Sequence, residues 1–152
     1  MSIDVSCAVT IERDRPAVVA YVEDATHDTQ WIRALRSVEP LSPGPLAKGS
    51  RVKRTAAMMG RQMDYVTEVI EHQPGRRVAM ATVSGPFPAL VTYTFEDAGP
   101  ARARVTIRNQ GGKGVAFAIF GPLIGQMVNI RVRGDLSALK SAVEREPSSP
   151  TG

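Results

Sequence analysis

Residues 49–69, with the sequence GSRVKRTAAMMGRQMDYVTEV, alternate in a way that indicates two β-strands joined by a tight turn. Gly60 and Arg61 suit the centre of a type II′ hairpin turn, which takes glycine at its first central position. The turn fixes which residues lie opposite each other and share a face of the sheet. The predicted register pairs Met58 with Met63, Ala56 with Tyr65, Arg54 with Thr67 and Val52 with Val69.

A second turn, at Pro74 and Gly75, adds a third strand to this sheet. Proline followed by glycine is the preferred centre of a type II turn, so we expect Gln73 to face Arg76. The pairs that follow are Val69 with Met80, Thr67 with Thr82 and Tyr65 with Ser84. Both turns therefore select the same inward face. The opposite face, which belongs in water, carries Arg51, Lys53, Gln62, Asp64, Glu68, His72 and Arg77.

Outside these strands the pattern predicts one further strand, two short helices, two more strands and one long helix. They are IDVSCAVTI (3–11), a helix beginning near Pro16, a second running from Thr26 or Asp28 through Trp31, FPALVTYTFED (87–97), ARARVTIRN (101–109) and a helix from about Pro122 to Arg145. This order predicts an α+β domain with its helices gathered against one sheet. We expect one domain over residues 1–146 and a disordered tail at 147–152.

The composition is that of an ordinary globular protein. The chain has 152 residues, of which 43% are hydrophobic and 22% charged, and its net charge is +4. No arginine cluster is dense enough to indicate nucleic-acid binding, so we expect a solvated basic surface. Lone Cys7 excludes an internal disulfide and fits a reducing cytoplasm. The use of arginine rather than lysine hints at a bacterial source with a GC-rich genome.

The N-terminus and the longest uncharged run bear on membranes. MSIDVSCAVTI has no basic start followed by an apolar run, so we read no signal peptide. The run GVAFAIFGPLIGQMVNI (114–130) is interrupted by glycine and proline and is too short to span a bilayer. Within it, Phe117, Ile119 and Phe120 form either an apolar lip that touches a membrane surface or a loop packed on the long helix.

Several stretches, in this order, resemble the START/SRPBCC superfamily, in the branch called polyketide cyclase/dehydrase-like. They are VTIERDRPAVVAYVEDATHDTQWIRAL (9–35), VIEHQPGRRVAM (69–80), YTFED (93–97) and RGDLSALKSAVE (133–144). The resemblance covers about residues 3–145. It implies the helix-grip fold, in which a curved antiparallel sheet grips the C-terminal helix around an apolar cavity. It implies no particular reaction, because one fold hosts many functions.

The residue that needs explaining is Arg54, a charge on the inward face. An unpaired buried charge is very unfavourable, so Arg54 requires a partner. One interpretation is an acidic group of a ligand, held by the forked guanidinium. A second places Arg54 near the end of an edge strand, where its head reaches water. A third is a structural ion pair with Asp135, which lies one helical turn from Arg131.

The inward face supplies the candidate ligand contacts. Most are apolar, and methionine, with its flexible thioether, suits a pocket that adapts to varied ligands. A few polar groups among them would orient a small molecule. Trp31 is added because, in this fold, the second short helix closes one end of the cavity. The full set is Trp31, Arg54, Met58, Met63, Tyr65, Thr67, Met80, Thr82, Phe87, Val91, Tyr93, Ile107, Asn109, Met127 and Arg131.

Other chemistries find little support in the sequence. Asp24, His27 and Asp28 lie close together, but one imidazole with two carboxylates at this spacing makes a poor zinc site, so we expect no metal and no cofactor. Asp24 suits a helix cap instead. No arrangement of serine or cysteine with histidine suggests a nucleophile.

Three functions stay open. The first is binding of a hydrophobic or aromatic small molecule in the cavity, anchored by Arg54, Tyr65 or Tyr93. The second is a cyclase or dehydratase in which Tyr65 or Tyr93 is the general acid and Arg54 stabilises an enolate. The third is a protein-interaction module with a filled cavity. We expect a cytoplasmic protein that is a monomer or a homodimer, without a transmembrane segment.

Overall fold

The elements follow the predicted order, with one additional strand, Leu35–Pro40, that the sequence pattern did not predict. The structure is a computed structural model, and it describes residues 3–58, 60–85, 88–111 and 115–146. The elements are β1 (Ile3–Ile11), α1 (Arg15–Glu23), the 3-10 turn η1 (Ala25–His27), α2 (Asp28–Trp31), β2 (Leu35–Pro40), β3 (Arg51–Met58), β4 (Arg61–Gln73), β5 (Arg77–Ser84), β6 (Ala89–Asp97), β7 (Ala103–Gly111) and α3 (Val115–Arg145).

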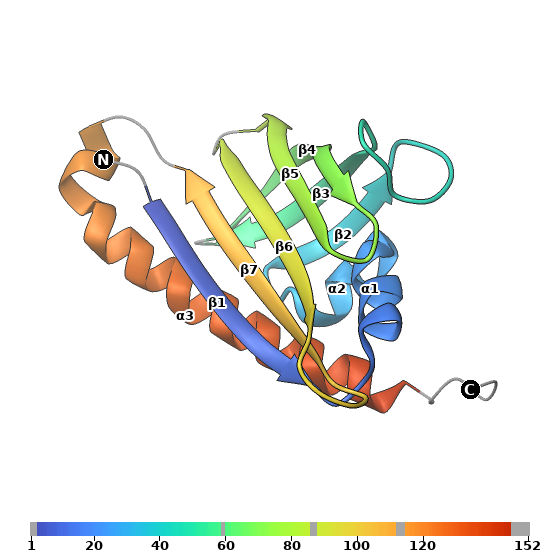
Figure 1. The fold of residues 1–152 in the computed structure, drawn as a ribbon. Coiled ribbons are helices and arrows are strands. Elements are labelled where there is room, and N and C mark those ends of the chain that lie inside the picture. Colours follow the sequence, from blue (N-terminus) through green and yellow to red (C-terminus); the bar gives the residue numbers. More distant parts are fainter. Residues whose placement is uncertain (1–2, 59, 86–87, 112–114, 147–152) are drawn as a thin grey trace.

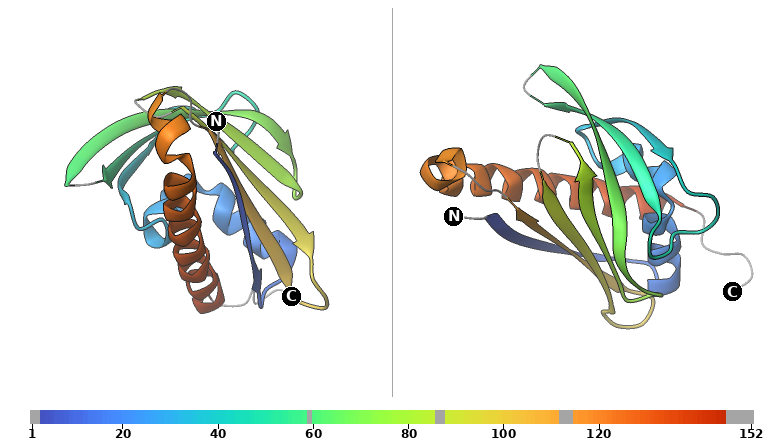
Figure 2. Two further views of the ribbon diagram at one scale, coloured as in Figure 1. Left: turned by 90° about the vertical axis from the view of Figure 1, so that its left-hand side faces the viewer. Right: turned by 90° about the horizontal axis from the view of Figure 1, so that it is seen from above.

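The seven strands form one antiparallel sheet in the order β1-β7-β6-β5-β4-β3-β2. The sheet curls, and α3 lies along its concave side (Figure 1). Seen from the side, α1 and α2 lie beside the C-terminal half of α3 (Figure 2). This is the α+β helix-grip architecture that the sequence predicts. No helix in the described ranges is long and apolar enough to cross a membrane.

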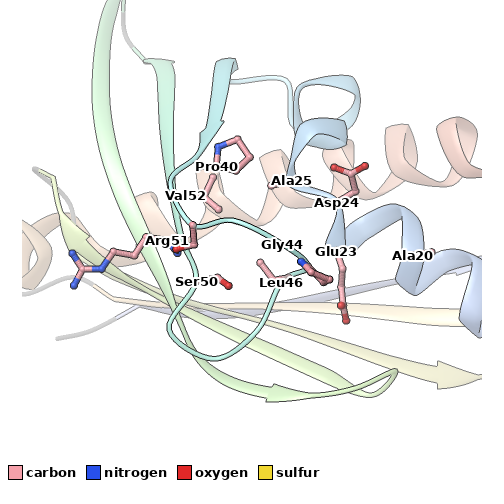
Figure 3. A pocket seen from close by; sticks show the side chains of 12 residues that line it. Ala20, Glu23, Asp24, Ala25, Pro40, Gly44, Leu46, Ser50, Arg51 and Val52 are labelled. Carbon is pink, nitrogen blue, oxygen red and sulfur yellow. The ribbon is translucent and has the colours of Figure 1, made fainter.

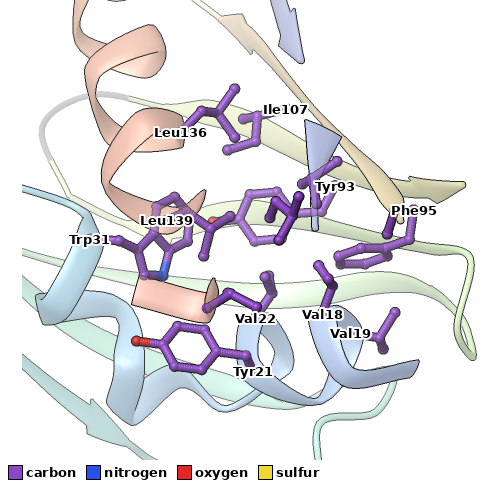
Figure 4. Close-up of a cluster of buried hydrophobic side chains, with 14 of the residues drawn as sticks. Val18, Val19, Tyr21, Val22, Trp31, Tyr93, Phe95, Ile107, Leu136 and Leu139 are labelled. Atoms are coloured by element: carbon purple, nitrogen blue, oxygen red, sulfur yellow. The ribbon is translucent and has the colours of Figure 1, made fainter. Parts of the chain in front are cut away.

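The two short helices are set by local capping. The side chain of Asp14 accepts a hydrogen bond from the backbone N–H of Ala17, and Pro16 lies in the first turn of α1. Asp24 caps the following turn in the same way through the N–H of Thr26. The apolar face of α1 then packs into a core that also contains Trp31, Tyr93, Phe95, Leu136 and Leu139 (Figure 4).

The hairpin between β3 and β4 differs from the predicted register by two residues. Met58 pairs with Arg61, Ala56 with Met63, Arg54 with Tyr65 and Val52 with Thr67. Gly60, with a φ of 78°, therefore occupies the second position of the connection rather than the first. Because side chains alternate with a period of two, a shift of two leaves every residue on its predicted face. Val52, Arg54 and Ala56 are accordingly buried.

The pairing of β4 with β5 is confirmed near its middle and wrong at its ends. Val69 pairs with Met80 and Thr67 with Thr82, as predicted. The turn has the expected bond from the N–H of Arg76 to the carbonyl of Gln73, but Gln73 pairs with Arg77 and Ser84 pairs with Val66. Two irregularities, between Val66 and Thr67 and between Val69 and Glu71, cause these differences.

The bulge after Val69 changes the face of the residues that follow it. One extra residue inverts the alternation, so His72 lies opposite Val78, which is fully buried. The prediction that His72 points into water is therefore wrong.

The long helix begins earlier than predicted. It starts at Val115 rather than near Pro122, so the stretch read as a loop leading into the helix is itself helical from Val115 onward. The first turns of α3 lie at an angle to the rest (Figure 2). Proline lacks the N–H that continues a helix, and Pro122 lies within this part of α3. The side chains of Phe117, Ile119 and Phe120 lie outside the described part of the structure.

Candidate functional site

Arg54 forms a buried ion pair with Asp28. The Nη2 and Nε atoms of Arg54 lie 2.9 and 3.3 Å from Oδ2 of Asp28. Arg54 is 5% exposed and Asp28 2%, so both charges are removed from water. Arg54 comes from β3, and Asp28 begins α2, which the chain folds against the end of the sheet.

This pairing corrects two expectations. Arg54 does not reach water, although its strand is next to the edge strand β2. Its partner is Asp28 and not Asp135, whose Oδ1 accepts a hydrogen bond from the backbone N–H of Arg33 at 3.3 Å. The sequence contained one usable signal: a carboxylate near the start of the second short helix, beside the expected cavity-closing Trp31.

The surroundings of the pair are only partly polar. Nη1 of Arg54 donates to the hydroxyl of Thr67, and Nη2 lies 4.0 Å from the sulfur of Met80. Within the described residues, Oδ1 of Asp28 and Nε1 of Trp31 are buried without a hydrogen-bond partner. Unpartnered buried polar atoms are uncommon and destabilising. The end of the core at α2 therefore has unused hydrogen-bonding capacity.

Burial controls the protonation of this region. It raises the pKa of Asp28 to about 6, against the opposing attraction of Arg54. Burial also raises the pKa values of Tyr93 and Tyr65 above their ordinary range. For Arg54, burial disfavours the charge, but Asp28 and the tyrosines outweigh it and raise the pKa of the guanidinium. The site thus combines a fixed cation, neutral phenols and a carboxyl group that titrates near pH 6.

A small void lies directly beside the pair. Its volume is about 10 Å³, and it is bounded by α1, η1, α2 and the inward faces of β3, β5 and β6. A space of that size holds at most one water molecule. Its lining residues are Val22, Glu23, Ala25, Asp28, Leu46, Arg54, Val78, Met80 and Tyr93.

A larger pocket opens on the surface next to the void. It has a volume of about 320 Å³ and lies between the end of α1, η1 and the connection from β2 to β3 (Figure 3). This is within the size range of small-molecule sites. Glu23, Ala25 and Leu46 line both spaces. The other lining residues are Ala20, Asp24, Pro40, Ser42, Gly44, Pro45, Ser50, Arg51 and Val52.

The sequence did not predict this pocket. Of its lining residues, only Val52 was expected on the inward face, and none belongs to the predicted ligand-binding set. The connection 41–50 carries no periodic pattern that would place it against α1. The alternation of β3 identifies Val52, but it contains no information about which loop covers that residue.

The predicted contact residues lie at different depths. Trp31, Arg54, Thr67, Met80, Tyr93 and Ile107 are buried. Met63, Tyr65, Thr82, Val91 and Asn109 are partly buried. Met127 and Arg131 are exposed, so the structure does not place them in the interior. The side chains of Met58 and Phe87 lie outside the described part.

A group of the buried residues does come together. Thr67 and Met80 contact Arg54 of the ion pair, and Tyr93 lines the void beside it. The ring centres of Trp31 and Tyr93 are 6.2 Å apart. Ile107 belongs to the hydrophobic core with Cys7 and Val105.

A histidine and a carboxylate, absent from the sequence-based site, lie close to the pocket. Nε2 of His72 is 3.2 Å from Oε1 of Glu23, and the two side chains are 16% and 19% exposed. Glu23 lines the pocket and the void. The β4 bulge brings His72 to this place, and no sequence signal identified that bulge.

Of the three side chains once considered for a metal, Asp24 and His27 contact each other, with 3.6 Å between Oδ2 and Nε2, whereas Asp28 pairs elsewhere. Asp24 caps η1, the ring of His27 stacks on Tyr21 at 4.1 Å, and Asp28 pairs with Arg54. Within the described ranges, no group of three or more histidine, cysteine or acidic side chains is arranged to hold a metal ion.

The fold and site together define an α+β helix-grip protein with a polar group enclosed in an apolar interior. Residues 2–144 match the family described as polyketide cyclase/dehydrase and lipid transport. The chain belongs to this family, and membership implies either hydrophobic ligand binding or polyketide cyclisation. No match was found among curated proteins.

Solved structures agree with this assignment at the level of the fold. The chain is similar to a START superfamily protein from Mycobacterium smegmatis, with 16% identity, a TM-score of 0.80 and coverage of 93% of this chain and 97% of that one. It is also similar to the Zhui aromatase/cyclase of Streptomyces sp. R1128, with 16% identity, a TM-score of 0.79 and coverage of 95% of each chain. A protein from Thermus thermophilus matches with 17% identity, a TM-score of 0.75 and coverage of 92% of this chain and 96% of that one.

Proposed function

We propose that the protein binds a hydrophobic or aromatic small molecule carrying an acidic group. The ligand enters from the pocket beside α1, and its acidic end reaches Arg54 on the inward face of the sheet. Its apolar body lies against Leu46, Val52 and the inward-facing side chains. Family membership supports the class of ligand.

The observation that carries this proposal is the buried Asp28–Arg54 pair. A buried ion pair is a poor means of stabilising a fold, because apolar residues of similar volume often do equally well or better. Here one carboxylate oxygen also lacks a partner among the described residues. A charged group held in an apolar interior, next to a void and a pocket, suits recognition of a ligand.

The geometry requires a small rearrangement on binding. The void alone is too small for a ligand, whereas the pocket is large enough but ends at Glu23, Ala25 and Leu46. Leu46 belongs to the connection between β2 and β3, so its displacement would join the two spaces. An acidic ligand would then compete with Asp28 for Arg54.

Ten of the sequence-predicted contact residues belong to the same proposal. Residues that line or adjoin the void would contact the acidic end, and partly buried residues of the inward face would contact the apolar body. The first group is Trp31, Arg54, Thr67, Met80 and Tyr93, and the second is Met63, Tyr65, Thr82, Val91 and Asn109.

A thermal-shift panel tests the proposal. The compounds are a hydroxylated naphthoic acid, a medium-chain fatty acid, a neutral naphthol and a neutral sterol. A ligand at about 100 times its Kd stabilises the folded protein by roughly 2.7 kcal/mol, which raises Tm measurably. We expect the acids to raise Tm more than the neutral compounds.

Matched variants of α1 locate the binding site. Ala20 lines the pocket, whereas Ala17 is an exposed alanine of the same helix outside it. We expect Ala20→Phe to abolish the shift and Ala17→Phe to retain it. Equal shifts in both variants would contradict entry through this pocket. If no compound shifts the wild type, the alternative of an interaction module with a filled cavity replaces the proposal.

A second candidate function, cyclisation or dehydration, is favoured by one specific observation. The His72–Glu23 pair supplies an acid–base couple beside the pocket, which the enzyme hypothesis otherwise lacks. Incubation with a poly-β-ketone thioester mimic tests it by mass spectrometry. We expect an enzyme to give a cyclised or dehydrated product that His72→Gln no longer forms. Product formation at the rate of the protein-free control would exclude this function for that substrate.

A further inference from the structure

Three large apolar side chains on α3 face away from the protein. Leu123, Met127 and Ile130 are 59%, 52% and 65% exposed. At roughly 100° per residue, they lie within an arc of about 60° on the helix. The side chains that α3 buries in the core, including Val132, Leu136 and Leu139, lie on the opposite side. We call Leu123, Met127 and Ile130 the outer stripe.

Cations border the outer stripe on both sides. Arg131 and Arg133 are exposed, and on a helical projection they lie roughly 80° to either side of Leu123. The sequence contains no aspartate or glutamate from Ala98 to Gly134, and no charged residue of either sign from Gly114 to Ile130. Among the described side chains, α3 is therefore apolar along the outer stripe and cationic on both sides of its C-terminal end.

We propose that the outer stripe docks α3 onto the surface of a membrane containing anionic lipids. An amphipathic helix lying in the interface buries apolar side chains at the boundary of headgroups and acyl chains. Arg131 and Arg133 have stems long enough to follow the apolar surface while their heads reach lipid phosphates. The helix lies on the membrane and does not span it.

A lipid surface fits the outer stripe better than a protein partner does. A stable dimer buries roughly 800 Å² on each partner, which is more than three partly exposed side chains supply. The stripe is also a narrow ridge on a convex helix rather than a groove. Cations on both sides without an intervening acid match a surface that is uniformly anionic.

This inference is independent of the proposed ligand site, because none of the three side chains lines the pocket or the void. Vesicle flotation measures it separately. Wild-type protein is mixed with phosphatidylcholine vesicles, with and without phosphatidylglycerol, and the bound fraction is compared at low and high salt.

We expect binding to vesicles with phosphatidylglycerol, and weaker binding at high salt. Leu123→Gln/Ile130→Gln should reduce the partition coefficient by about tenfold or more, since two apolar contacts are lost. Arg131→Gln/Arg133→Gln should reduce it by a similar factor and remove the salt dependence.

The control carries the same substitutions at exposed apolar residues elsewhere. Ile70 and Val83 are 43% and 45% exposed on the sheet, and Ile70→Gln/Val83→Gln should bind vesicles as the wild type does. Equal binding by all variants, or no binding by the wild type, would overturn the proposal. So would sedimentation showing a dimer that Leu123→Gln/Ile130→Gln dissociates, because the outer stripe would then be a self-association surface. Circular dichroism establishes that each variant is folded.

Discussion

At the scale of single residues, the pair of Asp28 and Arg54 connects stability with function. Each charge is acceptable in the interior only because the other is present. Oδ1 of Asp28 has no hydrogen-bond partner among the described residues, so this arrangement is short of full hydrogen bonding there. Apolar side chains of similar volume often stabilise a fold as well as such a pair or better, and this strengthens the case for a role in binding.

Removing one charge should therefore be worse than removing both. Arg54→Ala leaves Asp28 buried alone and should lower the free energy of unfolding by about 3–5 kcal/mol. Asp28→Leu/Arg54→Met replaces the pair with apolar side chains and should leave the free energy near the wild-type value or above it. Urea denaturation measures both. A double variant as unstable as Arg54→Ala would show that the pair is needed for folding itself.

The raised pKa of Asp28 gives the stability a pH dependence. The pKa is 3.8 in the unfolded chain and about 6 in the folded protein, so between these values the folded state holds more protons. The contribution of Asp28 to the free energy of unfolding is therefore greatest below pH 4. It falls as pH rises through 6, by up to about 1.4 kcal/mol per pH unit.

Other carboxyl groups contribute their own slopes, so the informative quantity is the difference between wild type and Asp28→Asn. The variant carries a neutral isostere of the protonated carboxyl group, so it is expected to lack the fall between pH 4 and pH 6 and to gain in stability relative to the wild type over that range. Urea titrations at several pH values measure this difference. Parallel curves for the two proteins would contradict the assigned protonation.

At the scale of elements, turns and bulges decide where side chains meet. The hairpin register of β3 and β4 was predicted two residues away from its true position, yet every face was right because the error was even. In β4 the bulge after Val69 shifts the alternation by one, and this moves His72 from the predicted surface to a contact with Glu23. Neither this bulge nor the irregularity between Val66 and Thr67 contains a glycine or a proline.

Replacement of glycine by alanine should have opposite effects on stability at Gly85, which follows β5, and at Gly125, which lies within α3. A Cβ at Gly85 would lie 2.7 Å from Cβ of Tyr65, and Gly85 has a φ of 140°, so Gly85→Ala should destabilise the protein by about 1–3 kcal/mol. A Cβ at Gly125, within α3, would meet no atom within 4 Å, and Gly125→Ala should stabilise by about 0.5–1 kcal/mol. Urea denaturation of both variants tests this; a stabilising Gly85→Ala would contradict the close approach of the chain there.

At the scale of the whole molecule, the order of most elements was predictable from the sequence. The positions of the segments that enclose the site, the connection 41–50 and α2, were not. Alternation, two Pro/Gly-containing turns and one long apolar stripe define the sheet and its helix. The pocket, by contrast, depends on where the connection 41–50 lies relative to α1, and the ion pair depends on how α2 folds over β3. These are long-range contacts between irregular segments, and local periodicity carries no information about them.

The central claim is that a hydrophobic acid enters through the pocket and reaches the interior near Arg54. Trp31 is the only tryptophan, lies in the buried core and has an indole N–H without a partner among the described residues, so its fluorescence reports on that interior. The most direct measurement is a fluorescence titration with the hydroxylated naphthoic acid. The account predicts a saturable change in the wild type and in Ala17→Phe that is lost in Ala20→Phe. An unchanged spectrum in the wild type, or the same curve in Ala20→Phe, would contradict it.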